Sequence, residues 1–308
     1  MADLSEHLVD ALATLYGSHA GHRAAHAKGA LCAATFTATP GAASLSRAPH
    51  LQGEAHRAHV RFSNGSGNPT AADGERDGRG IALKVYLPGG ATTDIVGLSL
   101  PTFFVRTPED LLAFNAARRL DPATGQPDME KVGAFLAEHP ETVPGVTAAI
   151  TAPTPASYAT VTYHGIHAFR FVAADGSSRH ARYHFEPDAG EESITDDEAA
   201  GRDRDYLQTE LADRFARGSA RFHLELELAE DDDPVDDPTA VWPEGRTRVR
   251  IAQLDVTGLA FDREQDGDVL VFDPTRVTDG IELTADAILH ARSDAYRVSV
   301  SRRMTAPG

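Results

Sequence analysis

The amino-acid sequence predicts an α+β protein whose centre is a closed or nearly closed antiparallel β-barrel of about eight strands. Two patterns predict this class. Runs in which apolar and polar residues alternate recur along the chain, and helical periodicity marks its front, its middle and its end. No linker rich in Pro, Gly or Ser and no internal repeat divides the 308 residues, so we expect one domain over residues 1–308.

The first half of the chain begins with a predicted helix over residues 3–16, where leucines recur at helical spacing. A loop rich in Gly, Asn and Asp covers residues 65–78, and loops of this length are often functional. Alternating runs predict strands at 31–39, 58–65, 80–87 and 92–107. Helical periodicity follows at 108–120 and 128–140.

The second half returns to the β pattern at 158–186, where Asp175 and Gly176 separate two alternating runs and predict a hairpin. The acidic run 231–238 predicts a solvated loop, because it lacks the spaced ligands and the glycine of a calcium loop. A helix is predicted at 192–217, strands at 221–230, 246–261 and 266–274, and a closing helix within 280–304.

Composition excludes several classes of protein. A formal net charge of -17 disfavours nonspecific binding to nucleic acid or anionic membranes, since both are polyanions. The sequence contains no apolar run of about 18 residues, so it predicts no membrane span. The start of the chain lacks the pattern of a secretory signal, so we expect a cytoplasmic protein. Cys32 is the only cysteine, which excludes an internal disulfide, a thiolate zinc site and an all-cysteine iron-sulfur site.

The closing helix carries a pair with chemical potential, Arg292 and Tyr296. Helical residues four apart lie on one face, about 5–6 Å between Cβ atoms. The guanidinium can therefore sit beside the phenol oxygen, and a fixed cation together with a metal would favour the phenolate. An ordinary exposed Arg/Tyr pair has the same spacing, so this stretch alone does not decide its role.

Histidine is abundant, with fourteen in the chain, yet most positions fit structural or surface roles. His164, His167, His180 and His184 fall on or beside the predicted hairpin, but a metal site there lacks further ligands. His26 differs because it lies in a polar patch just before an apolar strand. The other members of that patch are His22, Arg23 and Lys28.

Five blocks of sequence resemble the haem catalase superfamily, in the family's own order. They cover most of the chain, from about residue 23 to residue 303, and five ordered blocks are far more specific than any one of them. The blocks read HRAAHAKGALCAATF, VRFSNGSGNPTAADGERDGRGIALKVYL, TDIVGLSLPTFFVR, GIHAFRFVAADGSSRHARYHFEPDAG and FDPTRVTDGIELTADAILHARSDAYRVSVSRR.

The resemblance implies a haem b buried between the barrel and the closing helix. Tyr296 would be the proximal phenolate ligand of the iron, as tyrosine is in catalases, and Arg292 would support its charge. His26 would be the distal general acid and base, and Ser63 would orient its imidazole. The haem propionates would pair with Arg23, Arg61 and Arg303.

Two aromatic residues, Phe103 and Phe104, would pack over the haem edge or channel, although ordinary core aromatics fit equally well. Leu98 stands where catalases carry a distal asparagine that helps to position peroxide, and it cannot donate a hydrogen bond. Val300 replaces a histidine common in the large enzymes. Because the sequence stops soon after Arg303, we expect one catalase-like domain without the later helices or the flavodoxin-like domain of the large enzymes. It resembles the short, catalase-related peroxidase branch.

These observations predict a haem peroxidase that reduces hydrogen peroxide or organic hydroperoxides with small organic electron donors and has weak or no catalase activity. Two alternatives stay open. One is a fatty-acid hydroperoxide isomerase or lyase of the allene oxide synthase type, which carries threonine before the distal histidine and keeps the asparagine; here those positions are Ala25 and Leu98. The other is a noncatalytic haem-binding barrel. The sequence leaves the oligomeric state open, with a homodimer among the options.

Overall fold

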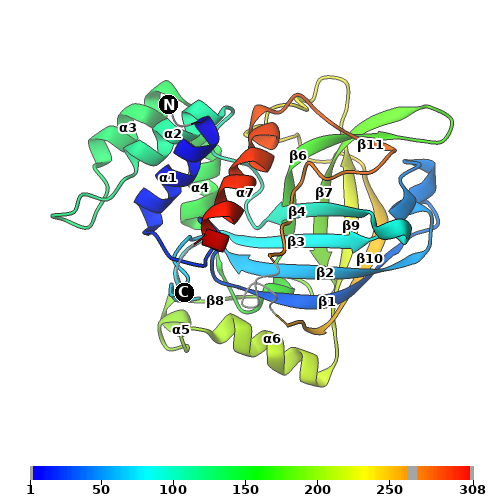
Figure 1. Ribbon diagram of the computed structural model, residues 1–308, viewed down its shortest axis with the longest axis horizontal. Helices are drawn as coiled ribbons and strands as arrows, with labels where there is room; N and C mark the ends of the chain where they lie inside the picture. The colour runs from blue at the N-terminus through cyan, green and yellow to red at the C-terminus, as the bar shows by residue number, and fades with distance from the viewer. Residues whose placement is uncertain (1–2, 262–268, 306–308) are drawn as a thin grey trace.

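The computed structural model describes residues 3–261 and 269–305, and its centre is an antiparallel barrel (Figure 1). The barrel strands are β1 (Gly29–Ala38), β2 (Ala55–Asn64), β3 (Arg79–Tyr86), β4 (Thr92–Leu98), β6 (Tyr163–Val172), β7 (Ser178–Pro187), β9 (Ala220–Leu228) and β10 (Arg248–Leu259). Their order is β6-β4-β3-β2-β1-β10-β9-β7, and β7 pairs with β6 to close the ring. A short strand, β11 (Ile281–Leu283), pairs with β6. The α+β barrel is confirmed.

The helices lie outside the barrel. They are α1 (Leu4–Tyr16), α2 (Pro108–Ala117), α3 (Met129–Glu138), α4 (Thr142–Thr151), α5 (Asp196–Ala200), α6 (Tyr206–Arg217) and α7 (Ala287–Thr305). In Figure 1, α1 to α4 gather at one side, α7 runs between them and the barrel, and α5 and α6 lie below. An ion pair of 2.7 Å between Arg302 and Asp10 ties α7 to α1. In the described part of the chain, no helix is both long and apolar enough for a membrane span.

The barrel interior is an aromatic and aliphatic core. Alternate residues of each strand point inward, as the period of two in a strand requires. Phe62, Phe222 and Tyr163 are fully buried there, and the rings of Phe62 and Phe222 lie 5.9 Å apart. Each such aromatic side chain removes roughly 150–250 Å² from water. This core fixes which residues face outward.

One row of paired residues on the outer face of the barrel lies at the candidate site. The strand register pairs Gly29 with Ser63, Ser63 with Gly80, and Gly80 with Leu98, across β1 to β4. Because a one-residue offset changes the face, and the neighbouring Phe62 is in the core, this row lies on the outside of the barrel. Ser63 and Leu98 therefore flank a glycine, so the strand presents no side chain between them.

The strand predicted over 92–107 ends early, at Leu98. Pro101 has no N–H to offer a strand neighbour, and Phe103 donates its N–H to the carbonyl of Pro238 instead. Thr107 then caps α2 by accepting a hydrogen bond of 3.1 Å from the N–H of Asp110. The apolar residues after Leu98 thus serve an aromatic cluster rather than the sheet.

The helix predicted over 192–217 is two helices. Thr195 and Glu198 form a capping box that fixes the start of α5, and Gly201 caps its end. The chain then turns before α6 begins at Tyr206. Ahead of α5, a two-residue strand, β8 (Ser193–Ile194), pairs with β5 (Thr154–Pro155).

Two further predictions need correction. Within the predicted strand 266–274, residues 266–268 lie outside the described residues, and 269–274 form no strand. Asp273 instead bends the chain, because its carboxylate accepts hydrogen bonds of 2.9 and 2.7 Å from the N–H and hydroxyl of Thr275. The acidic run 231–238 is a loop, but Asp233 is buried and makes a bidentate ion pair with Arg246 at 2.7 and 2.8 Å.

Helix α4 was not predicted, because Pro144 and Gly145 are poor helix residues. Pro144 is tolerated in the first turn, where backbone N–H groups have no partner within the helix. Gly145 allows close packing: a Cβ there would lie 2.8 Å from the carbonyl oxygen of Phe103. Tertiary contact therefore selects a helix that local propensity does not favour.

Candidate active site

Arg292 and Tyr296 form the pair that their spacing in α7 predicts. Arg292 Nε donates to Tyr296 Oη at 2.8 Å, and Nη2 donates to the same oxygen at 2.5 Å. Charge-assisted bonds of this kind are about twice as strong as neutral ones. Two N–H groups of one guanidinium point at one phenol oxygen, which is a geometry that suits a phenolate ligand.

A histidine and an aspartate extend this pair. The remaining guanidinium nitrogen, Arg292 Nη1, lies 2.9 Å from His167 Nε2, and His167 Nδ1 lies 2.6 Å from Asp286 Oδ2. Arginine can only donate, so Nε2 accepts and the ring proton is on Nδ1, donated to the carboxylate. Burial lowers the pKa of His167, and Asp286 opposes that shift. The result is a neutral imidazole between a cation and an anion.

On the other side of the site, His26 packs against β3 at Gly80, where the strand has no side chain. Its Nδ1 lies 3.0 Å from Ser63 Oγ, as the predicted orienting role requires. A Cβ on Gly80 would lie 2.9 Å from His26 Nδ1 and 2.9 Å from Ser63 Oγ. The imidazole therefore occupies the space that a side chain at position 80 would fill. Lys28, from the same predicted patch, is buried in an ion pair with Asp73 at 2.7 Å.

Positive charge gathers around His26. Burial, and after it the charges of Arg61, Arg292 and Arg23, lower the pKa of His26 from 6.5 to about 3. The imidazole is therefore neutral at pH 7. Two of the three predicted propionate arginines lie near it and come from different segments: Arg61 Nη2 donates to the carbonyl of Ala27 at 3.0 Å, and Arg23 Nη2 to that of Leu270 at 2.9 Å.

The remaining predicted residues differ in position. Arg303 is eleven residues from Arg292 on α7, which at 3.6 residues per turn places both on about the same face. Leu98 ends β4 in the outer row. Phe103 and Phe104 pack with each other at 5.7 Å and against the cluster of Phe114. That contact is what ordinary core aromatics make.

A cavity of about 640 Å³ opens between α7 and residues 271–276. Tyr296 is the predicted ligand that lines it, and Val300 lies on the same wall. Ligand sites commonly have volumes of about 300–1,000 Å³. Arg276 on the opposite wall is fixed by Asp94 at 2.5 Å, which is buried in β4. Tyr296 thus lies on a cavity whose opposite wall is tied to the barrel by the ion pair of Arg276 with Asp94.

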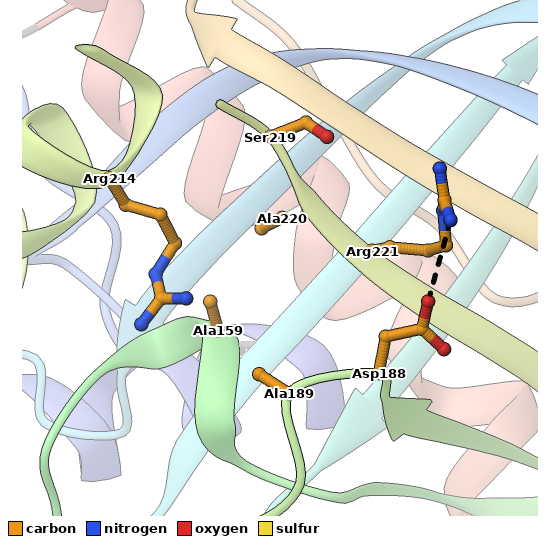
Figure 2. Close-up of a pocket in the computed structure, with 7 residues that line it drawn as sticks. All are labelled: Ala159, Asp188, Ala189, Arg214, Ser219, Ala220 and Arg221. Atoms are coloured by element: carbon orange, nitrogen blue, oxygen red, sulfur yellow. Dashed lines mark ion pairs between the residues drawn. The ribbon is translucent and has the colours of Figure 1, made fainter. Parts of the chain in front are cut away.

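A smaller cavity, about 280 Å³, lies away from these residues (Figure 2). In Figure 2 Arg214 lines one side, and Asp188 and Arg221 face each other on the other. Arg221 also pairs with Asp255 at 2.7 Å, and Arg214 with Glu210 at 2.8 Å. Its cations are already neutralised by carboxylates, so this cavity has no obvious chemistry.

Asp286 was missed by sequence reasoning, and His167 was given no role at the site. His167 and Asp286 are 119 positions apart. No local spacing connects residues so distant, and each has many ordinary roles. Burial is what separates them from other polar residues, since the side chains of His167 and Asp286 are 4% and 1% exposed. A buried charge is rare unless it is paired.

The fold and the site together define an antiparallel barrel protein with an arginine-supported tyrosine on a flanking helix and a partly buried histidine packed against the outer barrel wall. The chain belongs to the catalase family: the sequence profile described as Catalase matches residues 3–307.

Similar proteins include two named catalase-related peroxidase. The one from Mycolicibacterium paratuberculosis is 42% identical over 96% of this chain and 93% of its own length. The one from Synechococcus elongatus is 33% identical over 97% of this chain and 88% of its own. A crystal structure of a fungal catalase superposes with a TM-score of 0.83 at 25% identity, covering 96% of this chain and 62% of that one.

Proposed function

We propose that the protein is a haem-dependent peroxidase of the catalase family that reduces peroxides with small organic electron donors. Membership of the family and similarity to two catalase-related peroxidases support an oxidoreductase acting on peroxide. The observation that carries the proposal is the pair of charged hydrogen bonds from Arg292 to the oxygen of Tyr296, next to a cavity.

The residues present fit a haem. A phenol oxygen supported by a guanidinium is a donor for ferric iron, and tyrosine holds the haem iron in catalases. Haem also carries two carboxylates. In a chain of net charge -17, Arg61 and Arg23, whose charges lower the pKa of His26, form a local cationic site that suits such a group. Tyr296 would hold the iron, and Arg23, Arg61 and Arg303 would pair with the propionates.

When bound, the haem iron supplies the redox chemistry that peroxide reduction needs. The chain supplies proton transfer. His26 is neutral at pH 7 because burial and neighbouring cations lower its pKa to about 3. It can accept the proton that peroxide loses on binding, and the imidazolium so formed returns it readily to the departing oxygen. Ser63 and the bare Gly80 hold the ring in place for both steps.

Leu98 favours peroxidase over catalase activity. It flanks Gly80 in the outer row, and its side chain cannot donate a hydrogen bond to a second peroxide. We expect slow oxygen release and faster oxidation of small phenolic donors. An oxygen electrode measures the first, and Leu98→Asn should raise it. Rapid stoichiometric oxygen release by the unsubstituted protein would contradict this part of the proposal.

The decisive experiment is the absorption spectrum of the haem protein. A high-spin ferric Soret band with tyrosinate character should be present and should be lost in Tyr296→Phe. The control is Tyr86→Phe, at the end of β3 that is six residues from Gly80. An unchanged spectrum in Tyr296→Phe would show that the axial assignment is wrong. Rearrangement of a lipid hydroperoxide without any reductant would indicate an isomerase or lyase instead.

A further inference from the structure

The backbone of His26 has an uncommon conformation. Its φ is +54°, and no other non-glycine residue within 3–261 and 269–305 has a positive φ. Side chains with a Cβ rarely adopt this region, so the surroundings must hold it there. The backbone dihedral angles at His26 set the direction of its Cα–Cβ bond, and therefore the direction in which the imidazole points.

Two hydrogen bonds from the loop between β2 and β3 hold this conformation. His26 donates its N–H to the carbonyl of Gly65 at 3.0 Å, and Ala27 donates to the carbonyl of Ser66 at 3.0 Å. The peptide groups of Gly65 and Ser66 therefore act as a template for the turn at His26. Any movement of those two peptides would move the imidazole.

Asp77 fixes the template from the other side. Its Oδ2 accepts a hydrogen bond of 2.6 Å from the N–H of Ser66. The N–H of Gly65 donates to the carbonyl of Gly78 at 2.7 Å, and a Cβ on Gly65 would lie 2.6 Å from Asp77 Oδ1. The carboxylate is thus packed directly against the two peptides that hold His26.

We propose that Asp77 is a positioning residue for His26, acting through Gly65 and Ser66. The carboxylate fixes two peptides, the peptides fix the left-handed turn, and the turn directs the imidazole at Ser63. Arg79 strengthens the arrangement, since its Nη1 donates to the carbonyl of Asp77 at 2.7 Å. The inference rests on the proposed function only for its effect on the reaction with peroxide.

The test compares Asp77→Ala with Asp77→Asn in the protein as purified. Asparagine keeps an oxygen that can accept the N–H of Ser66, whereas alanine does not. In Asp77→Ala we expect amide hydrogen exchange at His26 and Ala27 to become at least tenfold faster, and the rate constant with hydrogen peroxide to fall at least tenfold. Asp77→Asn should restore both to within about threefold. The control is Glu75→Gln, an exposed carboxylate in the same loop.

Amide exchange decides the inference independently of catalysis. Unchanged exchange at His26 in Asp77→Ala would overturn it, and so would an equal loss in both Asp77 variants. If neither variant folds, exchange in the unsubstituted protein still decides: Ser66, His26 and Ala27 should open together. Protection at His26 that persists while Ser66 opens would contradict the proposal. An absence of any reaction with peroxide would instead count against the proposed function.

Discussion

Gly80→Ala tests whether the absence of a side chain at Gly80 in β3 makes room for the imidazole of His26. The new Cβ would lie 2.9 Å from His26 Nδ1 and 2.9 Å from Ser63 Oγ. Because comfortable contact between such atoms begins at about 3.5 Å, the ring must retreat by about 0.6 Å. A misplacement of about 1 Å in an active site can cost about a hundredfold in rate, so we expect a loss of roughly tenfold.

The assay is the second-order rate constant for reaction with hydrogen peroxide, followed by stopped-flow absorbance. The matched control is Gly78→Ala, two residues away, where a Cβ would meet Leu100 Cδ1 at an ordinary 3.5 Å. We expect the control to react within twofold of the unsubstituted protein. Unfolding by urea separates stability from positioning, because overpacking costs about 1–3 kcal/mol and need not change the rate of the folded fraction.

A rate for Gly80→Ala within twofold of the unsubstituted protein would refute the reasoning. It would mean that the imidazole has room to move without loss, so that contact with Ser63 does not set the rate. A slow Gly80→Ala variant that keeps its stability in urea, beside a Gly78→Ala control of unchanged rate, would support the steric account.

Three other predictions concern stability and the tyrosine side of the site. Lys28→Met should cost about 3–5 kcal/mol in urea unfolding, because it leaves the buried carboxylate of Asp73 without its cation; a cost below about 1 kcal/mol would contradict this. Burial lowers the pKa of His50 from 6.5 to about 3, so its contribution to stability is complete above pH 6.5 and is lost as the pH falls towards 3. His50→Leu should remove one proton from that acid dependence in pH-dependent unfolding, without loss at pH 7, since both ring nitrogens lack a partner; an unchanged slope would refute it. His167→Leu should lower thermal stability and broaden the Soret band, because Oδ2 of the buried Asp286 loses its donor and the guanidinium of the tyrosine pair loses its acceptor; an unchanged band would show that the histidine does not position the guanidinium.

The sequence predicts best what is local. Arg292 and Tyr296 are four residues apart on one helix, so periodicity alone brings their side chains together. The hairpin at Asp175 and Gly176 is confirmed for the same reason, since turn chemistry acts over a few residues. Local signals fail where distant packing decides, as at Gly145 in α4, where a close approach to Phe103 determines the structure.

The assignment of His26 needed more than periodicity. Taken singly, a histidine before a strand has no distinctive spacing, and only the ordered blocks of a known family marked it out. The structure then shows Gly80 as its seat and Asp286 as a member of the opposite network. Neither follows from spacing, because strand register between distant segments is what brings them into place.

On the outer face of the barrel, the polar residues of the strands wrongly predict exposure to solvent. Alternation correctly separates the apolar interior of β2 from its polar face, and such a face is normally solvated. In this protein the polar face is covered: Arg61 and Ser63 are buried in β2, and Lys84 and Asp94 are buried on neighbouring strands. Burying charged groups costs free energy unless partners are supplied. When a strand is buried on both faces but polar on one of them, a functional site on the polar face is the best explanation. In β2 the polar face is the outer one, and Ser63 contacts His26 there.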